Sequence, residues 1–96
     1  MDDEVAVSLR ITGRVQGVWY RGWVVDNAIE LGLRGWVRNR FDGSVETLLA
    51  GPPTAVEEMV RRCHEGPPAA RVLGVERTNA GDAGEVAPGF YERPTG

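Results

Sequence analysis

The order in which hydrophobic periodicity changes along the chain restricts the fold more than any other feature of this sequence. Apolar and polar residues alternate over 5–12, which is the two-residue period of a half-buried strand. The apolar residues Val24, Ala28 and Leu31 then recur at helical spacing. Gly32 predicts the end of this helix, because glycine readily takes the left-handed conformation that closes a helix.

The second half of the chain repeats this succession after a hairpin. Residues 34–51 predict two strands on either side of an Asp-Gly dipeptide, which is typical of tight hairpin turns. A second helix is expected where Thr54 and Glu57 have the spacing of a capping box. A Gly-Pro-Pro run at 66–68 ends this second helix.

Two further strands complete the order. Residues 70–78 predict a strand in which Gly74 fits a bulge, and residues 90–93 predict a short last strand at a sheet edge, followed by Pro94. The order β-α-β-β-α-β plus a short C-terminal strand predicts an α+β fold, the ferredoxin-like split βαβ sandwich. Both helices should cover one face of a mainly antiparallel sheet. The 96 residues leave no room for a second core, so 1–96 is expected to be a single domain.

The charged residues disfavour some classes of function. The net charge of −3 opposes a general affinity for nucleic acid. All eleven basic residues are arginines, and six of them lie within the first 40 residues, at positions 10, 14, 21, 34, 38 and 40. These six could form a local anion site, or they could reflect a genome that encodes its cationic residues as arginine.

The sequence also gives an expectation for the cellular compartment of the protein. No apolar run approaches the ~18 residues of a membrane-spanning helix. The N-terminal MDDEVAVSLR lacks the basic start of a signal peptide. The single cysteine, Cys63, excludes an internal disulfide, so a cytoplasmic location is expected. With one cysteine and one histidine in the chain, no metal site is expected.

The stretch GRVQGVWYR, residues 13–21, follows the first strand and opens the first helix. Gly13 and Gly17 permit backbone conformations that turn several N–H groups inward, and the start of a helix adds N–H groups without partners. Arg21 can donate two hydrogen bonds to one phosphate. The spacing matches neither GxxxxGK nor GxGxxG. An ordinary turn between strand and helix is therefore the alternative to a phosphate site.

A second polar residue lies in an unusual position. Asn39 falls near the end of the second strand, where asparagine is unfavourable, and its amide could hold a water molecule. An exposed asparagine without a role is the alternative. From the predicted topology we expect the end of this strand at the sheet edge opposite the start of the loop, at a distance that the sequence does not fix.

At these residues the sequence resembles the acylphosphatase family. The first family motif, an apolar residue followed by x-G-x-V-Q-G-V-x-F-R, matches ITGRVQGVWYR at 11–21. Tyr20 stands where phenylalanine is usual, and its hydroxyl needs a partner if it is buried. The second motif, G-aromatic-V-Lys/Arg-N-x-x-x-G-x-V with a glycine six residues later, matches residues 35–51. The resemblance covers nearly the whole chain.

The resemblance implies a hydrolase that cleaves the carboxyl–phosphate bond of acyl phosphates without metal or cofactor, in a monomeric cytoplasmic protein. It implies that Arg21 and Asn39 are the catalytic residues, that Asn39 orients the attacking water, and that Asn39 lies near the loop. It also implies a phosphate cradle made of Val15, Gln16, Gly17, Val18, Trp19, Tyr20 and Arg21. Inorganic phosphate, the product, is then expected to inhibit competitively.

Neither motif contains a cysteine or histidine, so we expect direct attack of water on phosphorus. The main rival is a non-catalytic, small-anion-binding regulatory domain, since one fold hosts many functions. A single-strand RNA binder is a weaker rival. It would need stacking aromatic residues on the sheet in the pattern of RNA-recognition domains, which GRVQGVWYR does not supply, and the net charge opposes it.

Overall fold

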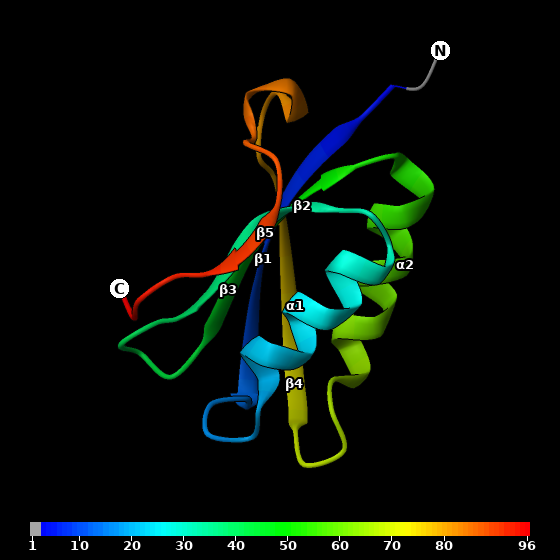
Figure 1. Cartoon of the computed structure of the whole chain (residues 1–96). Helices are drawn as coiled ribbons and strands as arrows, with labels where there is room; N and C mark the ends of the chain where they lie inside the picture. The colour runs from blue at the N-terminus through cyan, green and yellow to red at the C-terminus, as the bar shows by residue number, and fades with distance from the viewer. Residues whose placement is uncertain (1–2) are drawn as a thin grey trace.

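The computed structural model describes residues 3–96 and has its elements in the predicted order (Figure 1). The elements are β1 (Val5–Arg14), α1 (Tyr20–Glu30), β2 (Arg34–Asn39), β3 (Val45–Gly51), α2 (Pro53–Glu65), β4 (Arg71–Asn79), the 3₁₀ helix η1 (Ala83–Glu85) and β5 (Phe90–Glu92). Residues 1 and 2 of the expected domain lie outside the described residues, and that 1–96 is a single domain stays a prediction.

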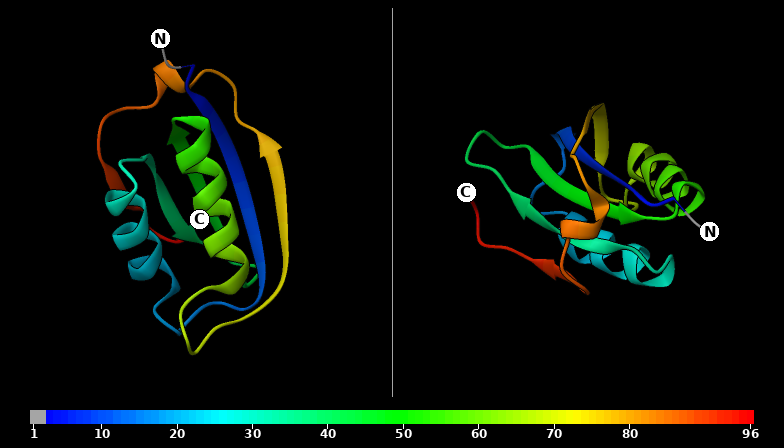
Figure 2. Two further views of the ribbon diagram at one scale, coloured as in Figure 1. Left: turned by 90° about the vertical axis from the view of Figure 1, so that its right-hand side faces the viewer. Right: turned by 90° about the horizontal axis from the view of Figure 1, so that it is seen from above.

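The five strands form one sheet in the order β4-β1-β3-β2-β5. Neighbouring strands are antiparallel except for β2 and β5, which are parallel. Both helices cover the same face of the sheet (Figure 2). This arrangement confirms the predicted ferredoxin-like fold, including the edge position of the last strand.

One prediction about the sheet is wrong. Because β1 and β2 both run antiparallel to β3, they are parallel to each other and end at the same edge of the sheet. Val45 of β3 pairs with Ile11 on one side and with Asn39 on the other. The end of β2 therefore lies near the start of the loop after β1, whereas we expected it at the opposite edge. A crossover helix returns the chain to the edge from which it started, so the next strand runs in the same direction as the first.

Both helices end where the sequence predicts, but α2 does not begin as expected. Helix α1 ends as expected, with Gly32 at φ 71° and a hydrogen bond of 2.9 Å from the N–H of Leu33 to the carbonyl of Ala28. Helix α2 ends before Gly66. The predicted capping box is wrong: α2 begins at Pro53, and no side-chain hydrogen bond caps it.

The reason for that difference is the proline. Proline fixes φ near the helical value and needs no acceptor at the first helical position, so the helix begins two residues earlier than the capping box predicts. Thr54 then lies inside the helix. Glu57 accepts a hydrogen bond of 2.9 Å from Arg77 of β4 instead of closing the helix start.

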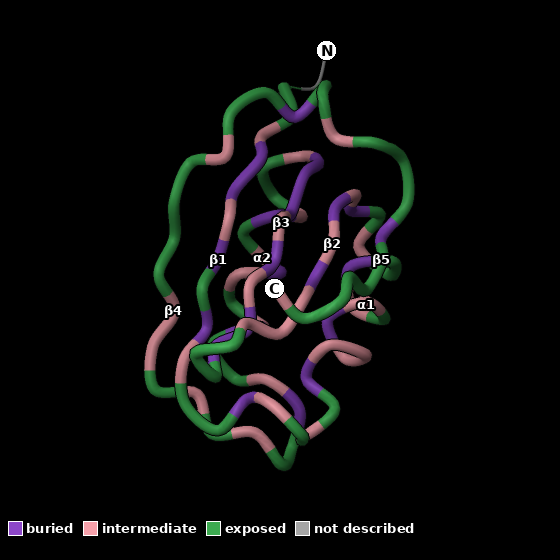
Figure 3. The backbone as a smooth tube through the Cα atoms, turned by 90° about the vertical axis from the view of Figure 1, so that its left-hand side faces the viewer, coloured by how far each residue is buried: buried purple, intermediate pink, exposed green. Residues whose placement is uncertain are grey.

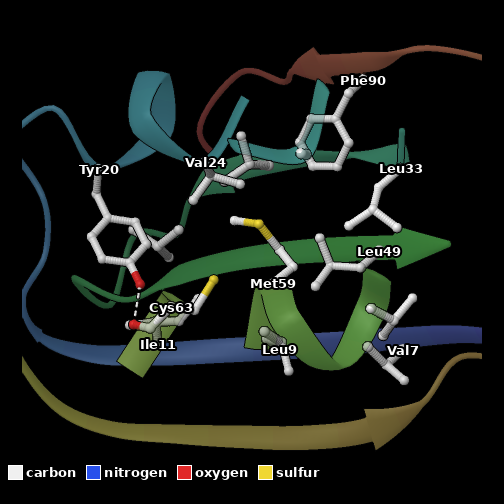
Figure 4. Close-up of a cluster of buried hydrophobic side chains, with 14 of the residues drawn as sticks. Val7, Leu9, Ile11, Tyr20, Val24, Leu33, Leu49, Met59, Cys63 and Phe90 are labelled. Carbon is white, nitrogen blue, oxygen red and sulfur yellow. Dashed lines mark hydrogen bonds between the residues drawn. The ribbon is translucent and has the colours of Figure 1, made fainter. Parts of the chain in front are cut away.

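The core fills the space between the sheet and the two helices (Figures 3 and 4). Leu9, Ile11 and Leu49 from the sheet meet Val24 of α1 and Met59 of α2, and all five are fully buried. Alternate residues of β1 thus face the helices, as the period of two predicts.

Two irregular segments complete the fold. The register between β1 and β4 shifts between Thr12 and Gly13, opposite the segment that contains Gly74, where the sequence suggested a bulge. The 3₁₀ helix η1 was not predicted, and Arg34 anchors it by donating hydrogen bonds of 2.8 and 3.2 Å to the carbonyls of Ala83 and Val86. Neither α-helix within residues 3–96 has the length and apolarity that crossing a membrane demands.

Candidate active site

The loop between β1 and α1 is shaped by two residues with positive φ. Gly17 has φ 75°, and Trp19, which is the N-cap of α1, has φ 68°. Residues in the left-handed conformation within a turn can direct successive backbone N–H groups toward one side, where these groups can bind an anion. Val15, at the start of the loop, is buried and fixes the loop to the core.

The first turn of α1 leaves its N–H groups available. The first intrahelical hydrogen bond runs from the N–H of Trp23 to the carbonyl of Trp19, at 3.1 Å. The N–H groups of Tyr20, Arg21 and Gly22 precede this bond and have no intrahelical acceptor. Among the described residues no side chain caps this end, and the first turn contains no acidic residue. A helix start of this kind favours a negatively charged ligand.

A small cavity of about 120 Å³ lies beside this helix start, at the sheet edge where β1 and β2 end. Its lining combines residues from three separate segments of the chain, which are Val15, Gly17, Trp19, Tyr20, Arg21, Gly22, Asn39 and Glu92. Arg21 and Asn39, far apart in the sequence, therefore share one cavity.

Two residues of the expected cradle do not line this cavity. The side chain of Gln16 points to the hairpin, where its Nε2 donates hydrogen bonds to the carbonyls of Arg40 (2.7 Å) and Ser44 (2.8 Å). Val18 is half-buried and packs against the core. Any contact of these two residues with a phosphate would therefore come from their backbone N–H groups. Gln16 ties the loop to the segment that follows Asn39.

Asn39 carries an unpaired polar atom. Its Oδ1 is buried and has no hydrogen-bond partner among the described residues, although its main-chain carbonyl accepts a bond of 3.1 Å from the N–H of Gly96. A buried acceptor without a partner costs about 1–3 kcal/mol, so such atoms are rare and call for an explanation. A donor that enters the cavity, such as a water molecule, would satisfy this oxygen.

Arg21 faces a carboxylate that sequence reasoning missed. Its Nε lies 3.8 Å from Oε1 of Glu92, and both side chains are partly exposed. In the parallel pairing of β5 with β2, Glu92 lies opposite Val37, two residues before Asn39. Only the sheet topology brings Glu92 to the site, and no local motif signals it. Gly22, also missed, could have been inferred from its place directly after Arg21 at the helix start.

The hydroxyl of Tyr20 has the partner that burial requires. It donates a hydrogen bond of 2.6 Å to the carbonyl of Cys63 in α2 (Figure 4). The hydroxyl therefore points into the core. Burial raises the pKa of this hydroxyl well above its usual value, and the contact with Cys63 adds to the effect. Burial also raises the pKa of the Cys63 thiol to about 12, which keeps the thiol neutral.

The residues that line the cavity therefore offer only a few kinds of chemical group. It provides a guanidinium and helix N–H groups for an anion, an amide oxygen that can accept a hydrogen bond, and one carboxylate. Among the described residues the cavity is lined by no serine, threonine, cysteine, histidine or lysine that could attack a substrate. Residues 3–96 also hold no group of three or more His, Cys, Asp and Glu residues arranged to bind a metal ion.

Several known proteins similar to this chain are acylphosphatases. The family model for acylphosphatase matches residues 7–91. An acylphosphatase of Rhizorhabdus wittichii is 52% identical over 93 residues, which cover 97% of this chain and 92% of the relative. An acylphosphatase of Rhodospirillum rubrum is 54% identical over 87 residues, covering 91% and 93%. The solved structure of an acylphosphatase from Coxiella burnetii has a TM-score of 0.89 at 33% identity and covers 95% of this chain and 94% of its own.

Proposed function

The chain belongs to the acylphosphatase family, and from this premise we propose that it hydrolyses the carboxyl–phosphate bond of acyl phosphates to a carboxylate and inorganic phosphate. The observation that carries this proposal is the shared cavity of Arg21 and Asn39, in which a cationic anion-binding site meets a buried amide oxygen without a partner. An anion site and a water site next to each other are what hydrolysis of a phosphoryl group requires.

In the proposed mechanism the phosphoryl group binds against the first turn of α1. The guanidinium of Arg21 and the N–H groups of the loop and helix start donate hydrogen bonds to its oxygens. These donors also stabilise the charge on the three equatorial oxygens when the bond to the carboxylate lengthens. Val15, Gly17, Trp19 and Tyr20 shape the cradle through their backbone, and Gln16 and Val18 would contribute their N–H groups alone.

Asn39 is proposed to orient the attacking water. Its Oδ1 accepts one hydrogen bond from the water and directs the water's oxygen toward phosphorus, opposite the leaving carboxylate. A neutral amide cannot take the proton, so the proton passes to a phosphoryl oxygen of the substrate. The products are then the carboxylate and dihydrogen phosphate, and the carboxylate leaves without protonation because it is a weak base.

A regulatory domain that only binds a small anion is the alternative. It would need Arg21 and the N–H groups but would have no use for a buried, unpaired Oδ1 of Asn39. That oxygen therefore favours the hydrolase.

The test is the hydrolysis of an aryl acyl phosphate with and without a chelator. We expect turnover that resists the chelator, loss of both turnover and phosphate binding in Arg21→Ala, and retained phosphate binding in Asn39→Ala with turnover at least about a hundredfold lower. Arg14→Ala, an exposed arginine at the same end of the sheet that does not line the cavity, is the matched control for a lost positive charge. Near-normal turnover by Asn39→Ala would contradict the role of this residue in orienting water.

Three further properties are part of the proposal. Inorganic phosphate acts as a competitive inhibitor, because the same cradle would bind substrate and product. The protein acts as a monomer, which sedimentation in solution can test. It acts in the cytoplasm, and the free, buried thiol of Cys63 supports a reducing compartment.

A further inference from the structure

The cavity is large enough for the phosphoryl group but not for a whole acyl phosphate. Its volume of about 120 Å³ is well below the roughly 300–1,000 Å³ of pockets that enclose a drug-sized ligand. A cavity of this size suits a phosphoryl group with one attacking water. The organic part of the substrate must therefore lie outside the cavity, on its rim.

One side chain dominates the apolar part of that rim. Of the large apolar side chains that are exposed within residues 3–96, Trp19 alone lines the cavity, and 61% of it is accessible to solvent. The other lining residues with large side chains are buried, as Tyr20 is, or charged, as Arg21 and Glu92 are. When the phosphoryl group is bound in the cavity, an acyl group that extends out of it meets the indole of Trp19, which is the apolar surface available on the rim.

The indole is held in place by the glycine that follows Arg21. A Cβ atom added at Gly22 would lie 2.2 Å from Nε1 of Trp19, so the ring rests directly on the backbone of the first turn of α1. The backbone of Gly22 does not have a positive φ, so its conformation does not itself require glycine. A side chain at this position would therefore have to displace the indole.

The backbone of Trp19 gives a second, independent sign of function. It is the one non-glycine residue with positive φ among residues 3–96. A large residue in the left-handed region is strained, whereas glycine or asparagine adopts it at lower cost. Strain of this kind persists where surrounding structure maintains it and is concentrated at ligand sites. The chain keeps an exposed, strained tryptophan beside the phosphate cavity.

We infer that Trp19 determines substrate specificity, because its indole is the binding surface for the acyl group and selects flat, apolar acyl groups over short aliphatic ones. This inference rests on the proposed hydrolysis of acyl phosphates and names the class of substrate. Stacked or edge-to-face aromatic pairs gain energy beyond the burial of their area. An aryl acyl group can form such a pair with the indole, and an acetyl group cannot.

The experiment compares kcat/KM for benzoyl phosphate with kcat/KM for acetyl phosphate. Trp19→Asn removes the indole but introduces a residue that tolerates the left-handed conformation, and Trp19→Phe keeps an aromatic ring. We expect the benzoyl-to-acetyl ratio to fall about three- to tenfold in Trp19→Asn and to stay near the wild-type ratio in Trp19→Phe. The ratio is the readout because general damage to the loop would lower kcat/KM for both substrates together and leave their ratio unchanged.

Gly22→Ala is the second variant. Alanine favours the helix more than glycine does, so the variant should fold, yet its methyl group displaces the indole without removing it. We expect the ratio to fall here as well. An unchanged ratio in both Trp19→Asn and Gly22→Ala would overturn the inference and leave the proposed hydrolysis intact. Absence of turnover of both substrates by the wild type would contradict the proposed function, and the inference with it.

Discussion

Tyr20 connects the start of one helix to the end of the other. The last four carbonyls of a helix lack intrahelical donors, and that of Cys63 is among the last four of α2. The hydroxyl of Tyr20 supplies the missing donor at 2.6 Å (Figure 4). A phenylalanine, which the family motif leads one to expect, would fill the same space without serving this carbonyl.

Replacing Tyr20 with Phe should therefore lower stability and leave the chemistry intact. We expect the free energy of unfolding, measured by urea denaturation, to fall by about 1–2 kcal/mol, because a buried carbonyl loses its donor. The kcat of the folded variant should stay close to the wild-type value, because the hydroxyl points into the core. Tyr91→Phe, at an exposed tyrosine, is the control. Unchanged stability together with a large loss of kcat would contradict this assignment.

Glu92 brings a negative charge to the proposed phosphate site. The carboxylate lies 3.8 Å from the guanidinium of Arg21, so a bound phosphate must share or replace this contact. Because both side chains are partly exposed, water and salt weaken the interaction.

Replacing Glu92 with Gln should tighten the binding of inorganic phosphate. We expect the inhibition constant of phosphate to fall about two- to fivefold at low ionic strength, which is the scale of an exposed ion pair. Glu85→Gln is the matched control, since it removes the same charge from an exposed position that does not line the cavity. A weaker inhibition in Glu92→Gln would indicate that the carboxylate mainly orients Arg21 for binding.

At the scale of the elements, Arg62 of α2 joins the two helices. Its guanidinium donates hydrogen bonds to Oδ1 of Asn27 (2.8 Å) and to Glu30 (2.5 Å), which belong to α1, and to Glu58 (2.9 Å) in its own helix. Glu58 also accepts hydrogen bonds from Arg61. Hydrogen bonds from these two arginines, Arg61 first, lower the pKa of Glu58 from 4.5 to about 2.

This lowered pKa makes the helix pair sensitive to acid. A carboxylate with a depressed pKa in the folded state stabilises that state above pH 4.5, and the contribution is lost as the pH falls from 4.5 toward 2. The free energy of unfolding of the wild type should thus exceed that of Glu58→Gln at pH 6, and the difference should shrink toward zero near pH 2. Urea denaturation at several pH values measures it. A difference independent of pH would show that the charge of Glu58 does not matter.

Most of the helices and strands could be predicted from local sequence patterns, whereas the candidate site could be predicted only in part. The strands, both helices and the left-handed end of α1 at Gly32 are set by periodicity and by glycine, so they could be predicted. The start of α2 was misplaced because Pro53 begins the helix before Thr54 can cap it. Glu92 could not be found, because its distance from Arg21 depends on the parallel pairing of β5 with β2. Arg21 and Asn39 were singled out through their motifs. Only the family resemblance implied that Asn39 lies near the loop, because our inference from the strand topology put the end of β2 at the wrong edge of the sheet.

At the scale of the whole molecule, the site exists only when the chain is folded. The loop 15–22, Asn39 and Glu92 come from three segments, and folding alone brings them to one cavity. A ligand of this cavity therefore binds the folded state and not the unfolded chain. Binding of this kind stabilises the fold by an amount that grows with the logarithm of ligand concentration.

Inorganic phosphate should consequently protect the protein against unfolding. Above its dissociation constant, each tenfold rise in phosphate should add about 1.4 kcal/mol to the free energy of unfolding. The measurement is a series of urea denaturations at constant ionic strength. Phosphate also strengthens apolar burial in any protein by its exclusion from the surface, so an increase alone does not identify a site.

Arg21→Ala separates the two effects. The general effect of phosphate depends on the surface exposed on unfolding, which this substitution hardly changes, whereas specific binding depends on the guanidinium. We expect the variant to retain only the increase that phosphate produces by its exclusion from the protein surface. Equal stabilisation of wild type and Arg21→Ala would mean that phosphate does not bind in the cavity, and it would contradict the phosphate site without any measurement of turnover.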